Sequence, residues 1–224
     1  MATHACTLTE PRVSAALTRM FEAAARDDEA VPDGPVPDGT VPYDRASLTA
    51  QQLADAAQEI YMPISADGGR LLYNLVRATG PAVVVEFGTS FGISTLHLAA
   101  AVRDNGKGRV ITTEMSRAKA AAARETFAAT GLDDVITVLE GDALQTLAGL
   151  RQPVDFLFLD GWKDLCLPVL QLLEPHIAPG TLVVADDVNL PDLGPYLDHV
   201  RDTANGYHSV TFPVEDGLEI SCRL

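Results

Sequence analysis

The sequence lacks the marks of several protein classes. No window reaches the roughly 18 apolar residues of a membrane-spanning helix. The N-terminus has neither the basic start nor the apolar run of a secretory signal. The formal charge is -15 and no cluster of lysines and arginines is present, which disfavours nucleic acid and anionic membranes as partners. We therefore expect a cytoplasmic protein.

Two kinds of chemistry also find no support in the residues. The five histidines show no paired spacing typical of metal ligands, and no serine lies in a nucleophile-elbow pattern, so hydrolase chemistry is not predicted. The three cysteines, Cys6, Cys166 and Cys222, are widely spaced. This spacing is more typical of reduced thiols than of a disulfide framework or a zinc site.

What the sequence does contain fits one α/β domain with an N-terminal extension. The chain has 224 residues, of which 47% are hydrophobic. Thr9 is a plausible N-cap for a helix that carries Val13 and Leu17 on one face, and a stretch rich in Val-Pro, Gly and Asp follows. We assign residues 1–46 to this helix and Pro/Gly-rich arm, and residues 47–224 to the main domain.

The main domain alternates between two hydrophobic patterns. Helices are expected over residues 47–60 and 67–78, and from residue 82 onward short β-rich runs alternate with helical stretches. Such alternation predicts a Rossmann-like, doubly wound and mostly parallel seven-stranded sheet. The runs YHSVTFPV and LEISCRL, joined through Glu215, Asp216 and Gly217, predict an antiparallel hairpin at the C-terminal edge.

The run VVVEFGTSFGIS predicts a binding turn between a strand and a helix. The strand ends at Glu86, and the turn through Gly88 and Gly92 leaves backbone N–H groups free to bind a nucleotide or a carboxylate. A purely structural turn is the alternative. Ser90 stands where a dinucleotide fingerprint has glycine, which disfavours NAD.

Two further strand ends carry acidic residues. Glu114 ends the run RVITTE, where a carboxylate can accept both hydroxyls of a ribose or simply begin the next helix. Asp142 precedes Ala143 after the following strand, where it can accept from an adenine amine or cap a helix. The predicted ends together outline a nucleoside site.

The sharpest cluster follows the fourth and fifth strands. FLFLDGWKD supplies Asp160, Trp162 and Lys163, and LVVADDV supplies Asp186 and Asp187. Carboxylate oxygens are the ligands that Mg²⁺ prefers. Neighbouring residues of a strand point to opposite faces, so both aspartates can share a metal only if the strand has ended at Asp186. The alternative is a set of solvated carboxylates with Lys163 in a surface ion pair.

At these residues the chain resembles the metal-dependent class I O-methyltransferases, in particular catechol O-methyltransferase and its bacterial relatives, over roughly residues 60–224. The resemblance implies S-adenosyl-L-methionine as cofactor and a divalent metal, Mg²⁺, held by Asp160, Asp186 and Asp187. It also implies that Trp162 covers the adenine and that Lys163 deprotonates the acceptor. The residues and the resemblance together give cofactor contacts at Met62, Ile64, Glu86, Gly88, Ser90, Ser94, Glu114, Met115, Asp142, Ala143, Asp160 and Trp162, and acceptor contacts at Met62, Lys163, Asp187 and Pro191.

The chain departs from the mammalian enzyme at three of these positions. Asp187 replaces an asparagine, Gly161 replaces a histidine, and Val210 falls where an acidic residue binds the second catechol hydroxyl. We expect methyl transfer to a hydroxyl of a small acceptor that is catechol-like or has other vicinal oxygens, and a cation near Lys163 that lowers the pKa of its amine. Alternatives are a nicotinamide-dependent oxidoreductase and a non-catalytic cofactor-binding protein. A homodimer is a further expectation.

Overall fold

The computed structural model describes residues 6–30 and 49–224, so the Val-Pro stretch and the predicted boundary at residue 46 lie outside the described residues. The helices are α1 Pro11–Ala30, α2 Ala50–Ala56, α3 Ala66–Thr79, α4 Ile93–Asn105, α5 Arg117–Thr130, α6 Ala143–Thr146, α7 Lys163–Leu173 and α8 Gly194–Arg201. The strands are β1 Val83–Phe87, β2 Arg109–Glu114, β3 Ile136–Glu140, β4 Val154–Leu159, β5 Ile177–Ala185, β6 Tyr207–Phe212 and β7 Leu218–Arg223.

These strands form one seven-stranded sheet in the order β3-β2-β1-β4-β5-β7-β6. The first five strands in chain order pair in parallel, and β7 pairs antiparallel with both β5 and β6. The predicted doubly wound fold and its C-terminal hairpin are therefore confirmed. The strand order reverses beside β1, so the turns after β1 and β4 open onto the crevice where such folds bind ligands.

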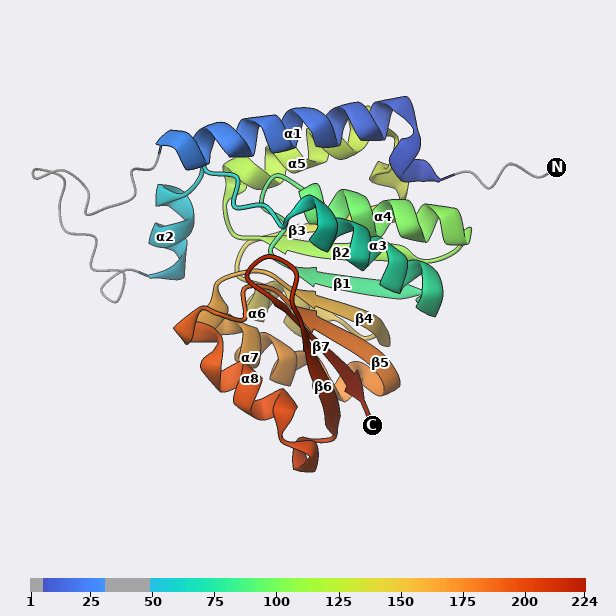
Figure 1. Ribbon diagram of the computed structural model, residues 1–224, viewed down its shortest axis with the longest axis vertical. Helices are drawn as coiled ribbons and strands as arrows, with labels where there is room; N and C mark the ends of the chain where they lie inside the picture. The colour runs from blue at the N-terminus through green and yellow to red at the C-terminus, as the bar shows by residue number, and fades with distance from the viewer. Residues whose placement is uncertain (1–5, 31–48) are drawn as a thin grey trace, which may run out of the picture.

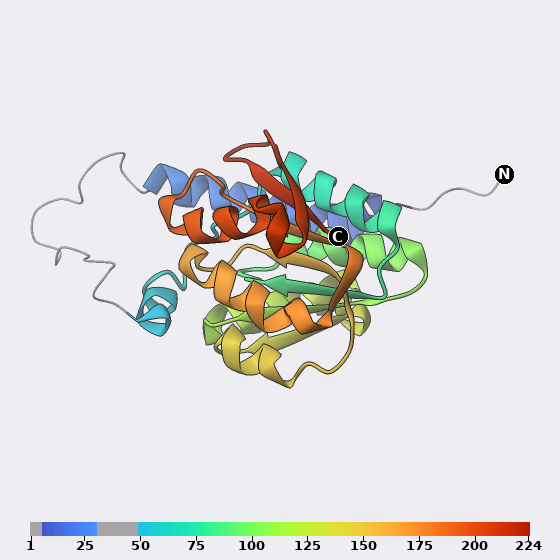
Figure 2. The same ribbon diagram turned by 90° about the horizontal axis from the view of Figure 1, so that it is seen from below.

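Alternating strand residues build a hydrophobic core on each face of the sheet. Val84 and Phe158 pack toward α3, α4 and α5, whereas Val85 and Leu159 pack toward α6, α7 and α8. Figures 1 and 2 show these two helix layers on opposite sides of the strands. Because both faces are covered, the central strands are almost wholly apolar, and the polar groups of the site lie at the strand ends.

The N-terminal helix belongs to this core. Helix α1 lies along α5 on the outside of one helix layer (Figure 1), and Val13, Leu17 and Met20 are buried there. A short turn before α1 is held by Asp104 of α4, which accepts from the hydroxyl of Thr7 at 2.6 Å. The predicted amphipathic helix is confirmed, and its apolar face covers α5.

Two expectations about the helices need adjustment. Helix α2 spans Ala50–Ala56, so it is shorter than the predicted residues 47–60, because the Thr49 capping box fixes its start and residues 57–59 form a turn. Helix α3 extends one residue beyond the predicted range at each end. Among the described residues, none of the helices combines the length and apolar character needed to cross a membrane.

Candidate functional site

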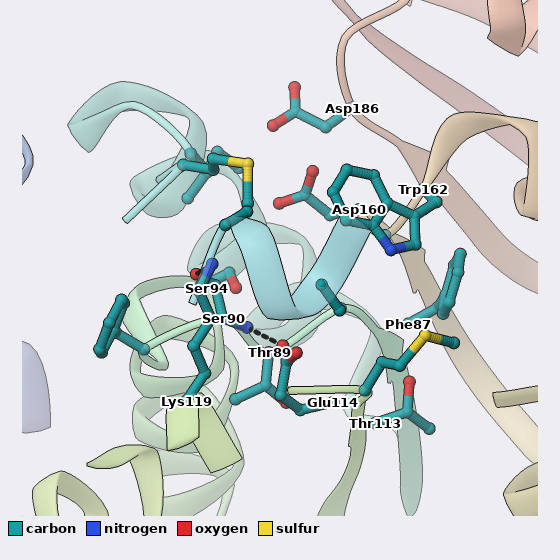
Figure 3. Close-up of a pocket in the computed structure, with 18 of the residues that line it drawn as sticks. Phe87, Thr89, Ser90, Ser94, Thr113, Glu114, Lys119, Asp160, Trp162 and Asp186 are labelled. Carbon is teal, nitrogen blue, oxygen red and sulfur yellow. Dashed lines mark hydrogen bonds between the residues drawn. The ribbon is translucent and has the colours of Figure 1, made fainter. Parts of the chain in front are cut away.

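A pocket of about 290 Å³ opens at the carboxyl ends of the parallel strands. Its wall joins the loop before α3, the turns after β1, β2 and β3, and the segments after β4 and β5. Figure 3 shows Asp160, Trp162 and Asp186 in one part of this pocket, and Ser90, Lys119 and Glu114 in another. The predicted residues that line it are Met62, Ile64, Gly88, Ser90, Ser94, Glu114, Met115, Ala143, Asp160, Trp162, Lys163, Asp186 and Asp187.

The turn after β1 is shaped by close backbone contacts. Gly88 has a φ of +99°, and a Cβ atom there would lie 2.7 Å from the carbonyl oxygen of Asp160. Ser90 also has a positive φ, of 47°, and its N–H donates to Oε2 of Glu114 at 2.7 Å. The turn is thus attached to β4 and to the end of β2, and it leads into α4, where Ser94 lines the pocket.

Glu114 is oriented by backbone donors on both of its carboxylate oxygens. The N–H of Ser116 donates to Oε1 at 2.7 Å, while that of Ser90 donates to Oε2. Burial raises the pKa of Glu114 above its usual value, although these donors and the charge of Lys119 counteract part of the increase. A carboxylate oxygen has two acceptor positions, so each oxygen retains one for a ligand. The geometry suits recognition of a vicinal diol.

Three carboxylates meet at the other end of the pocket. Asp160, Asp186 and Asp187 each offer an oxygen, and these atoms lie within 4.8 Å of one another. Asp160 and Asp186 are largely buried, and burial together with the charges of the neighbouring aspartates raises the pKa of both carboxyl groups. Such a group of mutually repelling carboxylates is the donor set that a hard divalent cation requires.

The backbone explains how two consecutive aspartates reach this cluster. Strand β5 ends at Ala185, so Asp186 is outside the regular strand, as the shared-metal prediction required. Asp187 adopts a φ of 59°, and its N–H donates to Oδ1 of Asp186 at 2.9 Å. Non-glycine residues with such φ values are uncommon and concentrate at functional sites.

Lys163 is paired with two of the carboxylates. Its Nζ atom lies 2.9 Å from Oδ1 of Asp160 and 2.9 Å from Oδ2 of Asp187. Burial alone lowers the pKa of Lys163, but the two carboxylates outweigh this effect and raise the pKa above its usual value. The expected lowering is therefore wrong for this arrangement, because the aspartate charges act on the amine with no cation to offset them.

Glu86, a predicted cofactor contact, is not part of the pocket wall. Its side chain is 0% exposed and lies beneath the turn, where Oε2 accepts from Thr95 at 2.5 Å and from Thr112 at 2.6 Å. Burial raises the pKa of Glu86 to about 7. Oε1 has no hydrogen-bond partner. The structure thus gives Glu86 a supporting position below the turn, one layer away from a ligand.

Two other predicted contacts also lie outside the pocket wall. Asp142 is the N-cap of α6 and accepts from the N–H of Leu144 at 2.9 Å, so the structure shows the capping role that was the alternative to adenine binding. Pro191 begins an exposed turn, and its neighbour Leu190 lines the pocket instead. Val210 lies on β6 with 58% of its surface exposed, outside the pocket wall.

Several pocket residues had no sequence signal. Tyr61 and Phe91 stack with ring centroids 4.2 Å apart, although they come from separate segments. Thr113 and Leu190 were read as ordinary strand and loop residues. Lys119 follows Glu114 by one helical turn beyond the Ser116 cap, a spacing that identifies it only once the pocket is known.

Comparison with known proteins agrees with this site. A family profile described as a methyltransferase domain matches residues 85–188. Catechol O-methyltransferase B of Danio rerio is 32% identical over 181 residues, covering 75% of this chain and 67% of that protein. Catechol O-methyltransferase of Mycobacterium tuberculosis is 34% identical over 147 residues, covering 65% of this chain and 66% of that protein.

Solved structures show the same fold. An O-methyltransferase from Bacillus cereus in complex with SAH superposes with a TM-score of 0.68 at 24% identity, covering 92% of this chain and 100% of that one. The O-methyltransferase TomG from Streptomyces achromogenes, in complex with SAM, gives a TM-score of 0.65 at 21% identity, covering 91% and 98%. With its sheet order, its strand-end pocket and these relatives, the chain belongs to the S-adenosylmethionine-dependent class I O-methyltransferases and resembles catechol O-methyltransferase.

Proposed function

We propose that this O-methyltransferase acts on a hydroxyl of a small acceptor that is catechol-like or has other vicinal oxygens, with a divalent cation, Mg²⁺, and a lysine base. The observation that carries the proposal is the meeting of Asp160, Asp186 and Asp187 within 4.8 Å of one another, with Lys163 beside two of them. A neighbouring pair of acceptor oxygens suits one cation, because both can reach it together.

The residues present fit a hard cation. All three side chains offer carboxylate oxygen, and histidine or cysteine ligands, which favour softer metals, do not occur in this group. Three anionic groups are more than Lys163 alone neutralises, so the cluster retains net negative charge that a dication would balance. Asp160, Asp186 and Asp187 would hold the cation, whose positive charge favours the ionised form of an acceptor hydroxyl.

The cofactor is proposed to lie along the rest of the pocket. The turn at Gly88 and Ser90 and the start of α4 at Ser94 would hold the methionine end, because backbone N–H groups at a helix start favour a carboxylate. Glu114 would accept the ribose hydroxyls, with Met115 and Ala143 beside the nucleoside and Trp162 supplying a flat aromatic surface for the adenine. Met62 and Ile64 would wall the methyl group and the acceptor.

Within this arrangement the protein has to orient the acceptor and remove its proton. Lys163 is the proposed base: Nζ would accept the hydroxyl proton as the oxygen attacks the electrophilic methyl group. In the ion-paired arrangement Lys163 already carries a proton, so the base role requires that Asp160 and Asp187 release it. Holding oxygen, methyl and sulfur in line accounts for much of the expected rate, since orientation replaces a bimolecular encounter.

The experiment that tests this function measures transfer of a labelled methyl group from S-adenosylmethionine to catechol. Transfer should require the acceptor, stop with EDTA and return when Mg²⁺ is added in excess. A panel of monohydroxy and vicinal dihydroxy aromatics distinguishes the acceptor class. Activity that persists in EDTA would contradict the metal, and equal rates on monohydroxy compounds would contradict the vicinal-oxygen acceptor.

A further inference from the structure

Lys119 is a buried cation in the proposed cofactor end of the pocket. The chain has three lysines, and two of them, Lys119 and Lys163, are buried and line the pocket. Lys163 is paired with the aspartate cluster, whereas Lys119 lies on α5 with 2% of its surface exposed. Removing an ammonium group from water is costly unless a partner offsets the loss, so its location calls for a partner within the pocket.

The contacts of Lys119 join it to the turn after β1. Its Nζ donates to Oγ of Ser90 at 3.2 Å, and the hydroxyl of Ser90 donates in turn to the carbonyl oxygen of Tyr61 at 2.5 Å. A serine hydroxyl has one proton and further acceptor capacity, so the two bonds are compatible. Nζ also lies 5.5 Å from the centre of the Phe91 ring, which stacks on Tyr61.

The same serine connects Lys119 to Glu114. The N–H of Ser90 donates to Oε2 of Glu114, as Figure 3 shows. Glu114 is buried enough for its pKa to be raised, and the positive charge of Lys119 acts against that increase. The neighbouring carboxylate in the strand register, Glu140 on β3, is bound by Arg124 at 3.1 Å and has its own counter-ion.

We propose that Lys119 is a positioning residue for the cofactor, which serves as the counter-ion of Glu114 and fixes the Ser90 turn, so that Glu114 faces the ribose as a carboxylate. This inference rests on the proposed role of Glu114 in ribose binding. An ionised carboxylate accepts from both hydroxyls of a diol, while a protonated one must use an oxygen as a donor. Lys119 therefore acts on the ribose contact through Glu114 and takes no part in methyl transfer.

Equilibrium binding to the full chain tests this role without relying on activity. Calorimetry compares S-adenosylhomocysteine with its analogue lacking both ribose hydroxyls, for the wild type, Lys119→Met and Lys119→Arg. Lys119→Met should weaken binding of S-adenosylhomocysteine about tenfold, the size typical of a lost charge-assisted bond. The analogue should lose no more than about twofold, because the affected contact is already missing. Lys119→Arg should retain most of the affinity.

Matched controls separate this role from a structural one. Lys107 is exposed, and Lys107→Met should bind both ligands as the wild type does. An equal loss for both ligands in Lys119→Met would show a general collapse of the turn and overturn the inference. If Lys119→Met does not fold, Lys119→Gln, which keeps a donor but no charge, provides the same comparison.

The variant Glu114→Gln distinguishes failure of this inference from failure of the proposed cofactor site. Glu114→Gln should lose most of the preference for the ligand with ribose hydroxyls. If it keeps that preference, Glu114 does not bind the ribose, and the underlying proposal fails with the inference. If Glu114→Gln loses the preference but Lys119→Met keeps it, only the role of Lys119 is overturned.

Discussion

Asp187 follows Asp186 directly in the chain, yet the two carboxylates meet in one cluster with Asp160. The relationship depends on the end of β5 at Ala185 and on the φ of 59° at Asp187, which turns the backbone after Asp186. Asparagine and aspartate tolerate this conformation better than other residues with side chains. The local backbone cost is small compared with the advantage of placing two adjacent ligands on one site.

Asp187→Asn should weaken Mg²⁺ binding by about tenfold or more, because it removes an anionic oxygen and keeps a side chain that tolerates the positive φ. Calorimetric titration with Mg²⁺ measures the change, and thermal unfolding should show little difference. Asp192→Asn is the matched control, since Asp192 is exposed on the next turn and outside the cluster. An Mg²⁺ affinity equal to that of the wild type would exclude Asp187 as a ligand.

Lys163→Met should lower kcat about 100-fold or more, the range expected for loss of a general base. Mg²⁺ should bind at least as tightly as before, because the variant removes a positive charge that pairs with Asp160 and Asp187. Single-turnover methyl transfer and Mg²⁺ titration are the two measurements, with Lys107→Met as control. Turnover at the wild-type rate would remove Lys163 from the chemistry.

Gly88→Ala should reduce both stability and cofactor affinity. The new Cβ would lie 2.7 Å from the carbonyl oxygen of Asp160 in a backbone with φ of +99°, so the turn and β4 must move apart. Gly106 offers a matched control, because it has a φ of +67° with nothing within 4 Å. Gly106→Ala should cost about 1 kcal/mol of unfolding free energy. If Gly88→Ala costs no more than that and binds S-adenosylhomocysteine normally, the close contact is unimportant.

Glu86→Gln should change how stability depends on pH. Burial raises the pKa of Glu86 from 4.5 to about 7, so between these values the folded protein holds a proton that the unfolded chain has released. The unfolding free energy contributed by this group therefore falls as pH rises through this window. Relative to the wild type, the variant should gain stability from pH 5 to pH 8, by about 3 kcal/mol at most.

Urea unfolding at several pH values measures this difference between the two proteins. Asp160 and Asp186 also have raised pKa values, but they are present in both proteins and their contribution cancels to first order. A difference in unfolding free energy that does not vary with pH would show that Glu86 keeps its ordinary pKa in the fold.

The fold and the main positions of the site follow from local patterns. Apolar runs that end in Glu86, Glu114, Asp160 and Asp186 marked where buried strands stop, and parallel topology brings such ends to one edge. The sequence could therefore predict the aspartate cluster, including the condition that β5 ends before Asp186. The condition concerned one strand boundary, and hydropathy alone was enough to locate it.

The remaining details depend on distances that a sequence does not carry. Asp142 had equal prospects as a cap and as a ligand, and the position of α6 decides for the cap. The pKa of Lys163 depends on two carboxylates from separate loops that face it together. Lys119 resembles any polar residue of an Ala-rich helix until the fold brings it to Ser90.

The most direct test of the account is a crystal of the full chain soaked with Mn²⁺ and S-adenosylhomocysteine, measured for anomalous scattering from manganese. The account predicts one strong peak bounded by carboxylate oxygens of Asp160, Asp186 and Asp187, beside the sulfur of the bound nucleoside. A map with the nucleoside in place and no manganese peak among these three carboxylates would contradict it.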